Sequence, residues 1–190
     1  YMREVFTRYD SALRAANSLD FDDLLSLTLR LWTEHPDSLA ALQKRFRYVM
    51  VDEYQDTNKV QYELLTALVR KRRNLFVVGD DDQSIYGWRG ADVRNILGFE
   101  KDFPEARVIT LDQNYRSTET ILAAANQVIG HNTARRPKNL WSALGKGRPL
   151  DHFVVADEEE EARAVVEWLG TIREKAGAKP ADFAILYRSN

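Results

Sequence analysis

Residues 49–57, which read VMVDEYQDT, decide the fold of this chain. Three apolar residues run directly into two adjacent carboxylates, Asp52 and Glu53. A short apolar run is typical of a buried strand in a parallel sheet, and ligands of such sheets bind beyond the carboxyl ends of the strands. The acidic pair is therefore predicted to face a ligand. A solvated strand end is the simpler interpretation when this stretch is taken alone.

The two acids suit different tasks at such a site. Asp52 is a candidate ligand for Mg²⁺, which takes a few carboxylate oxygens together with water and phosphate oxygens. Glu53 is a candidate base that orients or deprotonates a water for attack on a phosphate, and it is a second candidate ligand for the metal.

Helices and further apolar runs flank this stretch. Apolar residues at helical spacing predict helices over 1–18, from Asp20 to Pro36, and over 37–46. Downstream, strand-like runs alternate with helical segments, the runs at 75–78 and 108–111 and the helices at 58–72, 92–100 and 118–131. This alternation predicts parallel βαβ units with a right-handed crossover.

The C-terminal part begins a second unit of the same kind. Residues 132–150 are polar and basic and are predicted to form a loop-rich connection. A strand at 153–156, a helix at 157–175 and a strand at 183–187 follow. The acidic run at 157–161 indicates a helix start rather than a metal site, because Asp157 can cap the helix and the dipole favours glutamates in its first turn.

Composition narrows the class of protein without fixing it. The chain has 190 residues, 44% hydrophobic residues, a formal net charge of -2 and no cysteine. Disulfides and cysteine-ligated zinc are therefore excluded, and a reducing cytoplasm is the expected location. No apolar run is long enough to span a membrane, and the first residues do not resemble a signal peptide. Nucleic-acid binding would need only a local basic groove.

A second polar stretch, GDDDQSIYGWRGA at 79–91, follows the apolar run at 75–78. Gln83 can hydrogen-bond a phosphate oxygen or a water. Tyr86 and Trp88 are flanked by Arg89, and unpaired bases stack on aromatic groups arranged in this way. Because these aromatics stand between glycines and charges, we expect them at the surface rather than in the core.

A third stretch, LDQNYRST at 111–118, follows the run at 108–111. Tyr115 could stack on a base, and the planar guanidinium of Arg116 could reach a phosphate. Taken alone, this stretch is more simply a helix start with Ser117 or Thr118 as its N-cap.

Together, and in this order, the three stretches resemble the superfamily 1 DNA helicases of the UvrD, Rep and PcrA type. VDEYQDTN resembles their motif II, VVGDDDQSIYGWRGA their motif III and LDQNYRS their motif IV. Further matches are LDFDDLL at 19–25, RRPKNLW at 135–141 and FAILYRSN at 183–190, so the resemblance extends over essentially the whole chain.

The resemblance implies roles for individual side chains. In the ATP site, Asp52 would hold Mg²⁺, Glu53 would be the catalytic base and Gln83 would sense the γ-phosphate. Tyr115 would stack on the adenine, and Arg116 would touch the γ-phosphate.

The resemblance also implies a path for single-stranded DNA. It would run over four side chains, namely Phe21, Tyr86, Trp88 and Arg89. Asp22 and Asp23 are interpreted as charges at a helix start.

The implied fold is α/β, with the parallel sheet of a RecA-like P-loop NTPase flanked by helices. The first motor domain would include a helical lead-in at 1–47 and motifs II to IV at 48–116, and 117–190 would begin a second RecA-like domain. The implied function is an ATP-dependent 3′–5′ DNA helicase that acts on single-stranded DNA and single-strand/duplex junctions in repair or replication. Two alternatives stay open, the motor of a RecB- or AddA-like helicase–nuclease and a non-enzymatic DNA-binding module.

The phosphate-binding loop of this family, G-x-x-x-x-G-K-[ST], does not occur in the sequence. The nearest fragment, GKGR at 145–148, lacks the hydroxyl residue after its lysine. The chain is therefore interpreted as an internal piece with an incomplete sheet. We expect these 190 residues alone to hydrolyse no ATP and to self-associate through exposed edges.

Overall fold

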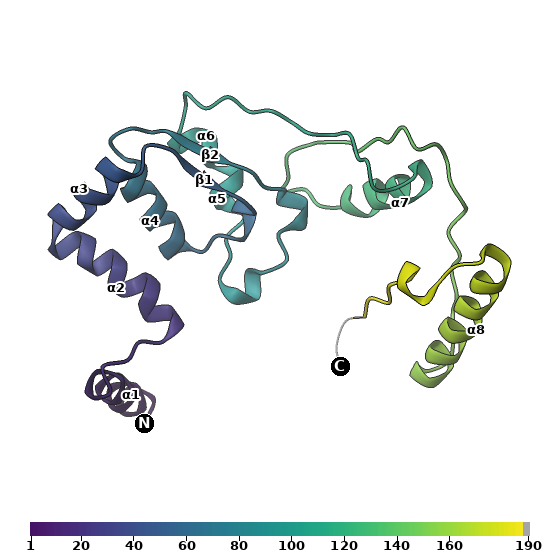
Figure 1. The fold of residues 1–190 in the computed structure, drawn as a ribbon, viewed down its shortest axis with the longest axis horizontal. Coiled ribbons are helices and arrows are strands. Elements are labelled where there is room, and N and C mark those ends of the chain that lie inside the picture. Colours follow the sequence, from purple (N-terminus) through teal and green to yellow (C-terminus); the bar gives the residue numbers. More distant parts are fainter. Residues whose placement is uncertain (188–190) are drawn as a thin grey trace. The chain divides into compact units, whose positions relative to one another are not determined.

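The chain forms helices and one two-stranded parallel sheet, as the computed structural model in Figure 1 shows. The structure describes residues 1–187. The last three residues of the predicted FAILYRSN stretch lie outside the described residues.

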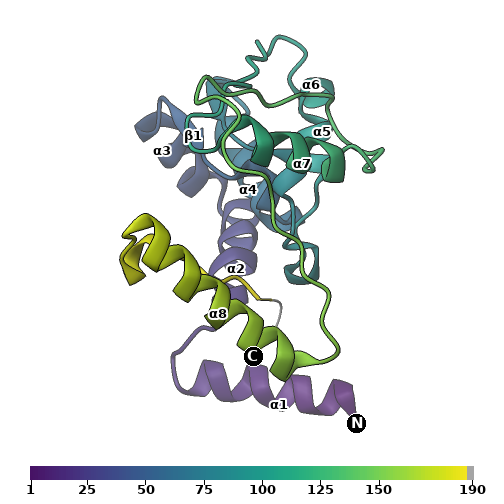
Figure 2. The ribbon, with the colours of Figure 1, turned by 90° about the vertical axis from the view of Figure 1, so that its right-hand side faces the viewer.

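Three helices precede the sheet, as predicted: α1 (Met2–Ala15), α2 (Phe21–Glu34) and α3 (Pro36–Arg45). The start of α2 is set by Asp20, whose side chain accepts a hydrogen bond from the Asp23 amide at 2.8 Å. The Tyr9 hydroxyl donates to the same carboxylate at 3.0 Å and ties α1 to α2. Figures 1 and 2 both show α1 on the far side of α2 from the two strands.

The sheet consists of β1 (Val49–Val51) and β2 (Leu75–Val77), joined by α4 (Lys59–Val69). The strands are parallel and in register, with Val51 paired with Val77, which confirms the predicted parallel β–α–β unit. Asn58 begins α4 with a capping box, in which its side chain accepts from the Gln61 amide.

The predicted helix at 92–100 is divided in two, α5 (Arg94–Leu97) and α6 (Phe99–Asp102). Gly98 ends the first piece, and its amide donates to the carbonyl of Arg94 at 2.8 Å. This corner turns Phe99 toward Tyr54 and Phe103, with ring centroids 5.6 and 4.7 Å away. Tyr54 and Phe103 are buried, so these three rings form an aromatic part of the core next to the C-terminal end of β1.

Three predicted strands, at 108–111, 153–156 and 183–187, are not formed. Their side chains are largely exposed, for example Leu111 at 81% and Val154 at 86%. A strand needs a neighbour to satisfy its backbone groups, and no described segment pairs with these three runs. Apolar composition alone was therefore insufficient to make them strands.

The remaining helices are α7 (Glu119–Ile129) and α8 (Glu158–Ala176). As predicted, Asp157 caps α8, accepting from the Glu160 amide at 2.8 Å, with the glutamates in the first turn. Short 3₁₀ turns lie at Tyr54–Asp56, Asp81–Gln83, Gly87–Arg89 and Pro180–Asp182.

Contacts divide the chain into one compact unit, Tyr1–Gly145, and a second that begins at Lys146. The motor-domain boundary expected after residue 116 stays a prediction. Within residues 1–187, no helix has the length and apolarity needed to cross a membrane.

Candidate functional site

The two strands deliver their polar loops to the same edge of the sheet. Val51 and Val77 are the last paired residues, and the acidic pair follows β1 while the 79–91 stretch follows β2. Pairing continues beyond the strands, since the Val78 amide donates to the Val51 carbonyl at 2.8 Å and the Tyr54 amide donates to the Val78 carbonyl at 2.9 Å. The two loops thus leave the sheet side by side.

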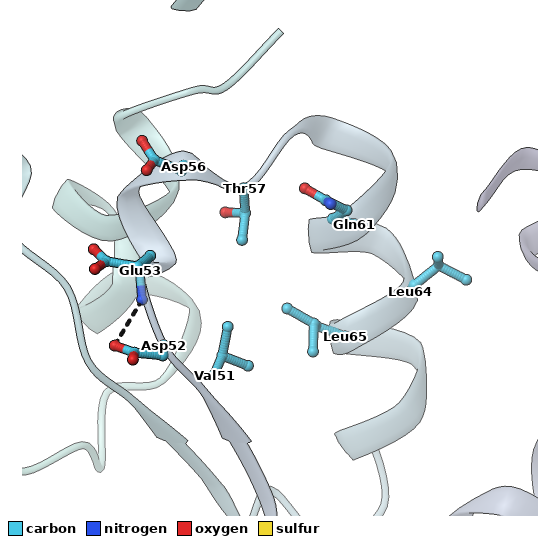
Figure 3. A pocket seen from close by; sticks show the side chains of 8 residues that line it. All are labelled: Val51, Asp52, Glu53, Asp56, Thr57, Gln61, Leu64 and Leu65. Carbon is cyan, nitrogen blue, oxygen red and sulfur yellow. Dashed lines mark hydrogen bonds between the residues drawn. The ribbon is translucent and has the colours of Figure 1, made fainter. Parts of the chain in front are cut away.

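The backbone reverses sharply at the acidic pair. Glu53 has φ 49° and ψ 43°, a left-handed conformation that costs a residue with a side chain about 1–2 kcal/mol. Its amide donates to the Asp52 carboxylate at 2.9 Å, and its carbonyl accepts from the Asp56 amide at 2.9 Å. Figure 3 shows the carboxylates of Asp52 and Glu53 pointing to the same side, away from Leu64 and Leu65 of α4.

A cavity of about 470 Å³ lies between this turn and α4 (Figure 3). Its lining is Val51, Asp52, Glu53, Asp56, Thr57, Gln61, Leu64 and Leu65. Both acids border it, although their carboxylates turn outward.

The donor set at the turn fits Mg²⁺ bound in part by water and substrate. Asp52 and Glu53 offer exposed carboxylate oxygens on one side of the backbone. Among the described residues, no group of three or more acids, histidines or cysteines forms a protein cage for a metal. Mg²⁺ commonly takes one or two carboxylates and keeps several waters, so Asp52 and Glu53 are compatible with it.

Gln55, to which the sequence analysis assigns no role, lies at the centre of the site. Its side chain is 1% exposed. The amide nitrogen donates to Glu53 Oε2 at 2.8 Å, and the amide oxygen accepts from the Asp80 backbone N–H at 2.9 Å. Gln55 stands inside the VDEYQDTN stretch that resembles motif II, which is the signal that could have identified it, but neither periodicity nor composition indicates its hydrogen bonds.

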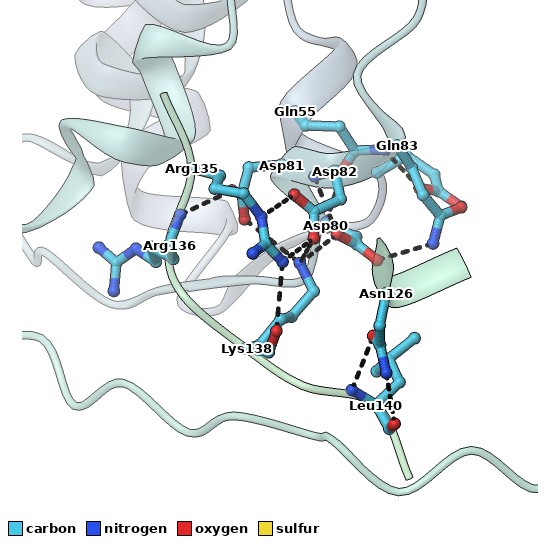
Figure 4. Close-up of polar contacts among 11 residues, drawn as sticks. Gln55, Asp80, Asp81, Asp82, Gln83, Asn126, Arg135, Arg136, Lys138 and Leu140 are labelled. Atoms are coloured by element: carbon cyan, nitrogen blue, oxygen red, sulfur yellow. Dashed lines mark hydrogen bonds and ion pairs between the residues drawn. The ribbon is translucent and has the colours of Figure 1, made fainter. Parts of the chain in front are cut away.

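A second missed feature is an ion cluster that anchors the 80–83 loop (Figure 4). Arg135 binds Asp82 with two parallel hydrogen bonds, at 2.7 and 2.6 Å. Lys138 Nζ lies 2.6 Å from Asp80 and 2.7 Å from Asp82. The Arg136 amide donates to Asp81 at 2.8 Å. The basic segment at 135–138 thereby holds all three aspartates of the loop.

The cluster shifts the acidity of its members. The guanidinium of Arg135, followed by the ammonium of Lys138, outweighs burial and lowers the pKa of Asp82 below 3.8. Burial opposes ionisation of Asp80 most strongly, but hydrogen bonds from Lys138 and Gln83 still lower its pKa. Burial likewise opposes the charge of Lys138, yet Asp80 and Asp82 raise its pKa. All three groups therefore stay charged at neutral pH.

Gln83 itself is exposed, and its amide nitrogen donates to Asp80 Oδ2 at 2.9 Å. Gln83 is thus connected through Asp80 and Gln55 to Glu53. The structure brings together the predicted base and the predicted γ-phosphate sensor.

The aromatic side chains of the 86–89 turn form a surface cluster. Trp88 is 74% exposed, and its ring centroid lies 6.4 Å from that of Tyr86. The guanidinium of Arg89 lies over both rings, 4.5 Å from the Trp88 centroid and 5.4 Å from the Tyr86 centroid. Gly90 ends the turn at φ 85°, a left-handed conformation that glycine adopts without strain. These aromatics are not core residues.

Hydrogen bonds at Thr57 connect this aromatic turn to the turn at 52–57, which we call the motif II turn. The Thr57 carbonyl accepts from the Asp92 amide at 3.0 Å and from the Asn95 side chain at 3.0 Å. Asn58 and Ala91 form an antiparallel bridge next to it. The acids and the aromatics therefore stand on one connected framework.

The other predicted site residues are exposed and less constrained. Tyr115 is 78% exposed and its hydroxyl donates to Gln113 at 2.9 Å. Phe21 begins α2 and is 89% exposed. No hydrogen bond or ion pair among residues 1–187 joins the side chain of Arg116 or Tyr115 to Glu53 or Gln83. The roles of Phe21, Tyr115 and Arg116 stay predictions.

Comparisons with known proteins match nearly all of the chain. The family model of the UvrD/REP helicase N-terminal domain matches residues 1–104, and that of the UvrD-like helicase C-terminal domain matches residues 109–190. The chain is 50% identical over 187 residues to a protein of Leuconostoc citreum named ATP-dependent DNA helicase PcrA. Proteins of the same name from Staphylococcus epidermidis and Staphylococcus aureus are 50% identical over 186 residues. Each match covers 98% of this chain, which spans about 25% of the length of these relatives.

Proposed function

Because this chain belongs to the UvrD/REP helicase family, we propose that it forms part of an ATP-dependent motor that moves on single-stranded DNA. One observation carries the proposal: the parallel pair β1 and β2 places the acids of one loop and Gln83 of the next at the same edge of the sheet. Ligands of parallel sheets bind at this edge. The relatives' names state ATP dependence and DNA helicase activity, which agrees with such a site.

In the proposed reaction, a water oxygen bonds to the γ-phosphorus of ATP while the Glu53 carboxylate accepts a proton from that water. The bond between that phosphorus and the oxygen leaving with ADP breaks at the same centre. Asp52 would hold Mg²⁺, which would neutralise charge on the phosphates. Gln83 would hydrogen-bond the γ-phosphate, and Tyr115 and Arg116 would bind adenine and γ-phosphate.

The same proposal assigns the aromatic surface to DNA. Tyr86 and Trp88 offer π-faces beside the cation of Arg89, and stacking on such faces tolerates any base. Phe21 is a further stacking candidate because of its exposure.

We further propose that the sheet belongs to a RecA-like P-loop fold, that movement is 3′–5′ and that the substrates include single-strand/duplex junctions. These finer assignments follow from the resemblance of motifs II, III and IV. The helicase–nuclease and non-enzymatic alternatives gain no support from the described residues or from the relatives.

The test is ATP hydrolysis by the full-length protein that contains this chain, with and without single-stranded DNA and with and without Mg²⁺. We expect Mg²⁺-dependent hydrolysis that DNA stimulates. Asp52→Asn should abolish it, whereas Asp37→Asn, an exposed acid in the first turn of α3, should not. A full-length protein without DNA-stimulated hydrolysis would contradict the proposed function.

A further inference from the structure

We propose that Gln55 is a positioning residue that couples the base Glu53 to the 80–83 loop and so links DNA binding to ATP hydrolysis. The inference rests on the proposed function and adds to it a residue that holds the base without touching substrate. It is argued from the bonds, burial and close packing of one side chain.

The first part is the contact with the base. Gln55 Nε2 donates to Glu53 Oε2 at 2.8 Å and, more weakly, to Asp56 Oδ2 at 3.4 Å. A buried amide that donates to a carboxylate fixes that carboxylate's direction, because the donor itself cannot turn toward water. Glu53 itself is exposed, so this hydrogen bond is what restrains its side chain.

The second part is the contact with the neighbouring loop. Gln55 Oε1 accepts from the Asp80 backbone N–H at 2.9 Å. A carboxylate requires a donor and an N–H requires an acceptor, so both partners demand the same orientation of the amide. Glutamine is the side chain of this length that supplies both at once.

Close packing holds the amide in place. A Cβ atom at Gly79 would lie 2.7 Å from Gln55 Oε1 and 2.8 Å from Ile96 Cδ1. The backbone at Gly79, two residues after β2, therefore approaches the amide more closely than a residue with a side chain would permit. Any movement of the 80–83 loop must be transmitted to the amide or must break its hydrogen bond.

The connection extends to the sensor and to the ion cluster. Asp80 accepts from Gln83 Nε2 at 2.9 Å through one carboxylate oxygen and lies 2.6 Å from Lys138 Nζ through the other. Glu53, Gln55, Asp80 and Gln83 thus form an unbroken series of polar contacts. The 80–83 loop runs directly into the aromatic turn at 86–89, so a shift of that turn on binding DNA would reach the base through the Asp80 amide and Gln55.

The test uses the full-length protein with Gln55→Met, which keeps the length of the side chain and removes both hydrogen bonds. We expect kcat in saturating single-stranded DNA to fall about 10- to 100-fold, with KM for ATP changed by less than about threefold. A second readout is equilibrium DNA affinity with and without a non-hydrolysable ATP analogue. The ratio of the two DNA affinities, which is typically about 5–150 in coupled systems, should be closer to one in the variant than in the wild type.

The matched control is Gln43→Met. Gln43 is also buried, at 6% exposure, and its side chain donates to the Ala67 carbonyl at 2.8 Å, remote from the acids. The Gln43→Met substitution should lower thermal stability, because a buried hydrogen bond is lost. It should leave kcat and the affinity ratio unchanged. If Gln55→Met does not fold, Gln55→Asn replaces it, because it keeps an amide but is one methylene too short to reach Glu53 and the Asp80 amide at once.

The outcomes separate the inference from the function on which it rests. A wild-type protein without DNA-stimulated hydrolysis would overturn the proposed function. A stimulated wild type whose Gln55 variant keeps both kcat and the affinity ratio would overturn the role of Gln55 alone. Equal losses in the Gln55 and Gln43 variants would also overturn it, since they would reflect stability.

Discussion

The motif II turn at 52–57 and the aromatic turn at 86–90 lie on one framework but are built in opposite ways. In the first, Tyr54 and Gln55 are each 1% exposed, and Gln55 donates a hydrogen bond to Glu53. In the second, Trp88 is 74% exposed and its neighbours are Tyr86 and Arg89. Phosphoryl transfer requires atoms fixed to fractions of an ångström, whereas stacking requires an open face. The difference in burial matches the two tasks proposed for these turns.

The strongest way to break the comparison is to remove the proposed base, Glu53, from the motif II turn. Glu53→Gln in the full-length protein should lower kcat by about 10²- to 10⁴-fold while ATP still binds, because the amide cannot accept the proton. Steady-state hydrolysis and nucleotide-binding titrations measure the two effects. Glu63→Gln, which loses only an exposed ion pair with Lys59 on α4, is the matched control. Normal turnover by Glu53→Gln would remove Glu53 from the reaction.

Replacing Lys138 should weaken the anchoring of the 80–83 loop, which contacts the motif II turn through Gln55. Lys138→Met leaves Asp80 and Asp82 with fewer partners, and their side chains are 25% and 10% exposed. We expect the free energy of unfolding to fall by about 2 kcal/mol. This is less than for a fully buried ion pair, because the cluster is partly exposed to water. Hydrogen exchange at the Asp80 and Gln83 amides of the full-length protein should become faster.

The control for this variant is Lys101→Met, an exposed lysine at the end of α6. It should leave exchange in the 80–83 loop unchanged. Unaltered exchange in Lys138→Met as well would mean that the loop is held by Gln55 and the sheet alone.

The exposed aromatic turn is tested by replacing Trp88. Trp88→Ala should reduce affinity for single-stranded DNA by about 1–3 kcal/mol, because one stacking face is lost, with little change in ATP binding. Trp88→Phe keeps a π-face and should retain most of the affinity. Fluorescence anisotropy with a labelled oligonucleotide measures both. Equal affinity of the alanine variant and the wild type would take Trp88 out of the DNA path.

The smallest expected effect is the pH dependence of the ion cluster. The pKa values of Asp80 and Asp82 lie below their ordinary value of 3.8, so the folded state binds fewer protons than the unfolded state. The resulting stability is present above pH 3.8 and is lost as pH falls through the lowered values. The difference in Tm between wild type and Lys138→Met should therefore shrink below about pH 4. A constant difference down to pH 3 would contradict the ionic origin of this anchoring.

Much of the fold could be predicted because its signals are local. Asp20 and Asp157 begin helices through caps that depend on the next three residues, and the runs before Asp52 and Gly79 form the paired strands. The runs at 108–111 and 153–156 have the same local signal but no described partner, so they form no strand.

The residue types of the candidate site could be predicted from the sequence, but the contacts between them could not. The acids, Gln83 and the aromatics each stand in a distinctive stretch of sequence. Lys138 reaches Asp80 across 58 positions, and Gln55 reaches the Asp80 amide across 25. Such contacts depend on how the loops fold back on each other, which periodicity and composition do not encode.

The left-handed backbone at Glu53 affects how replacements at this position will behave in a mutational scan. Glycine tolerates this conformation at no cost and asparagine at little, so they remove the carboxylate and leave the peptide geometry nearly intact. Valine, isoleucine and threonine remove the same carboxylate but also resist the geometry, so cellular abundance should fall together with growth. Scoring abundance beside growth would separate residues that the chemistry rejects from residues that the chain cannot accommodate.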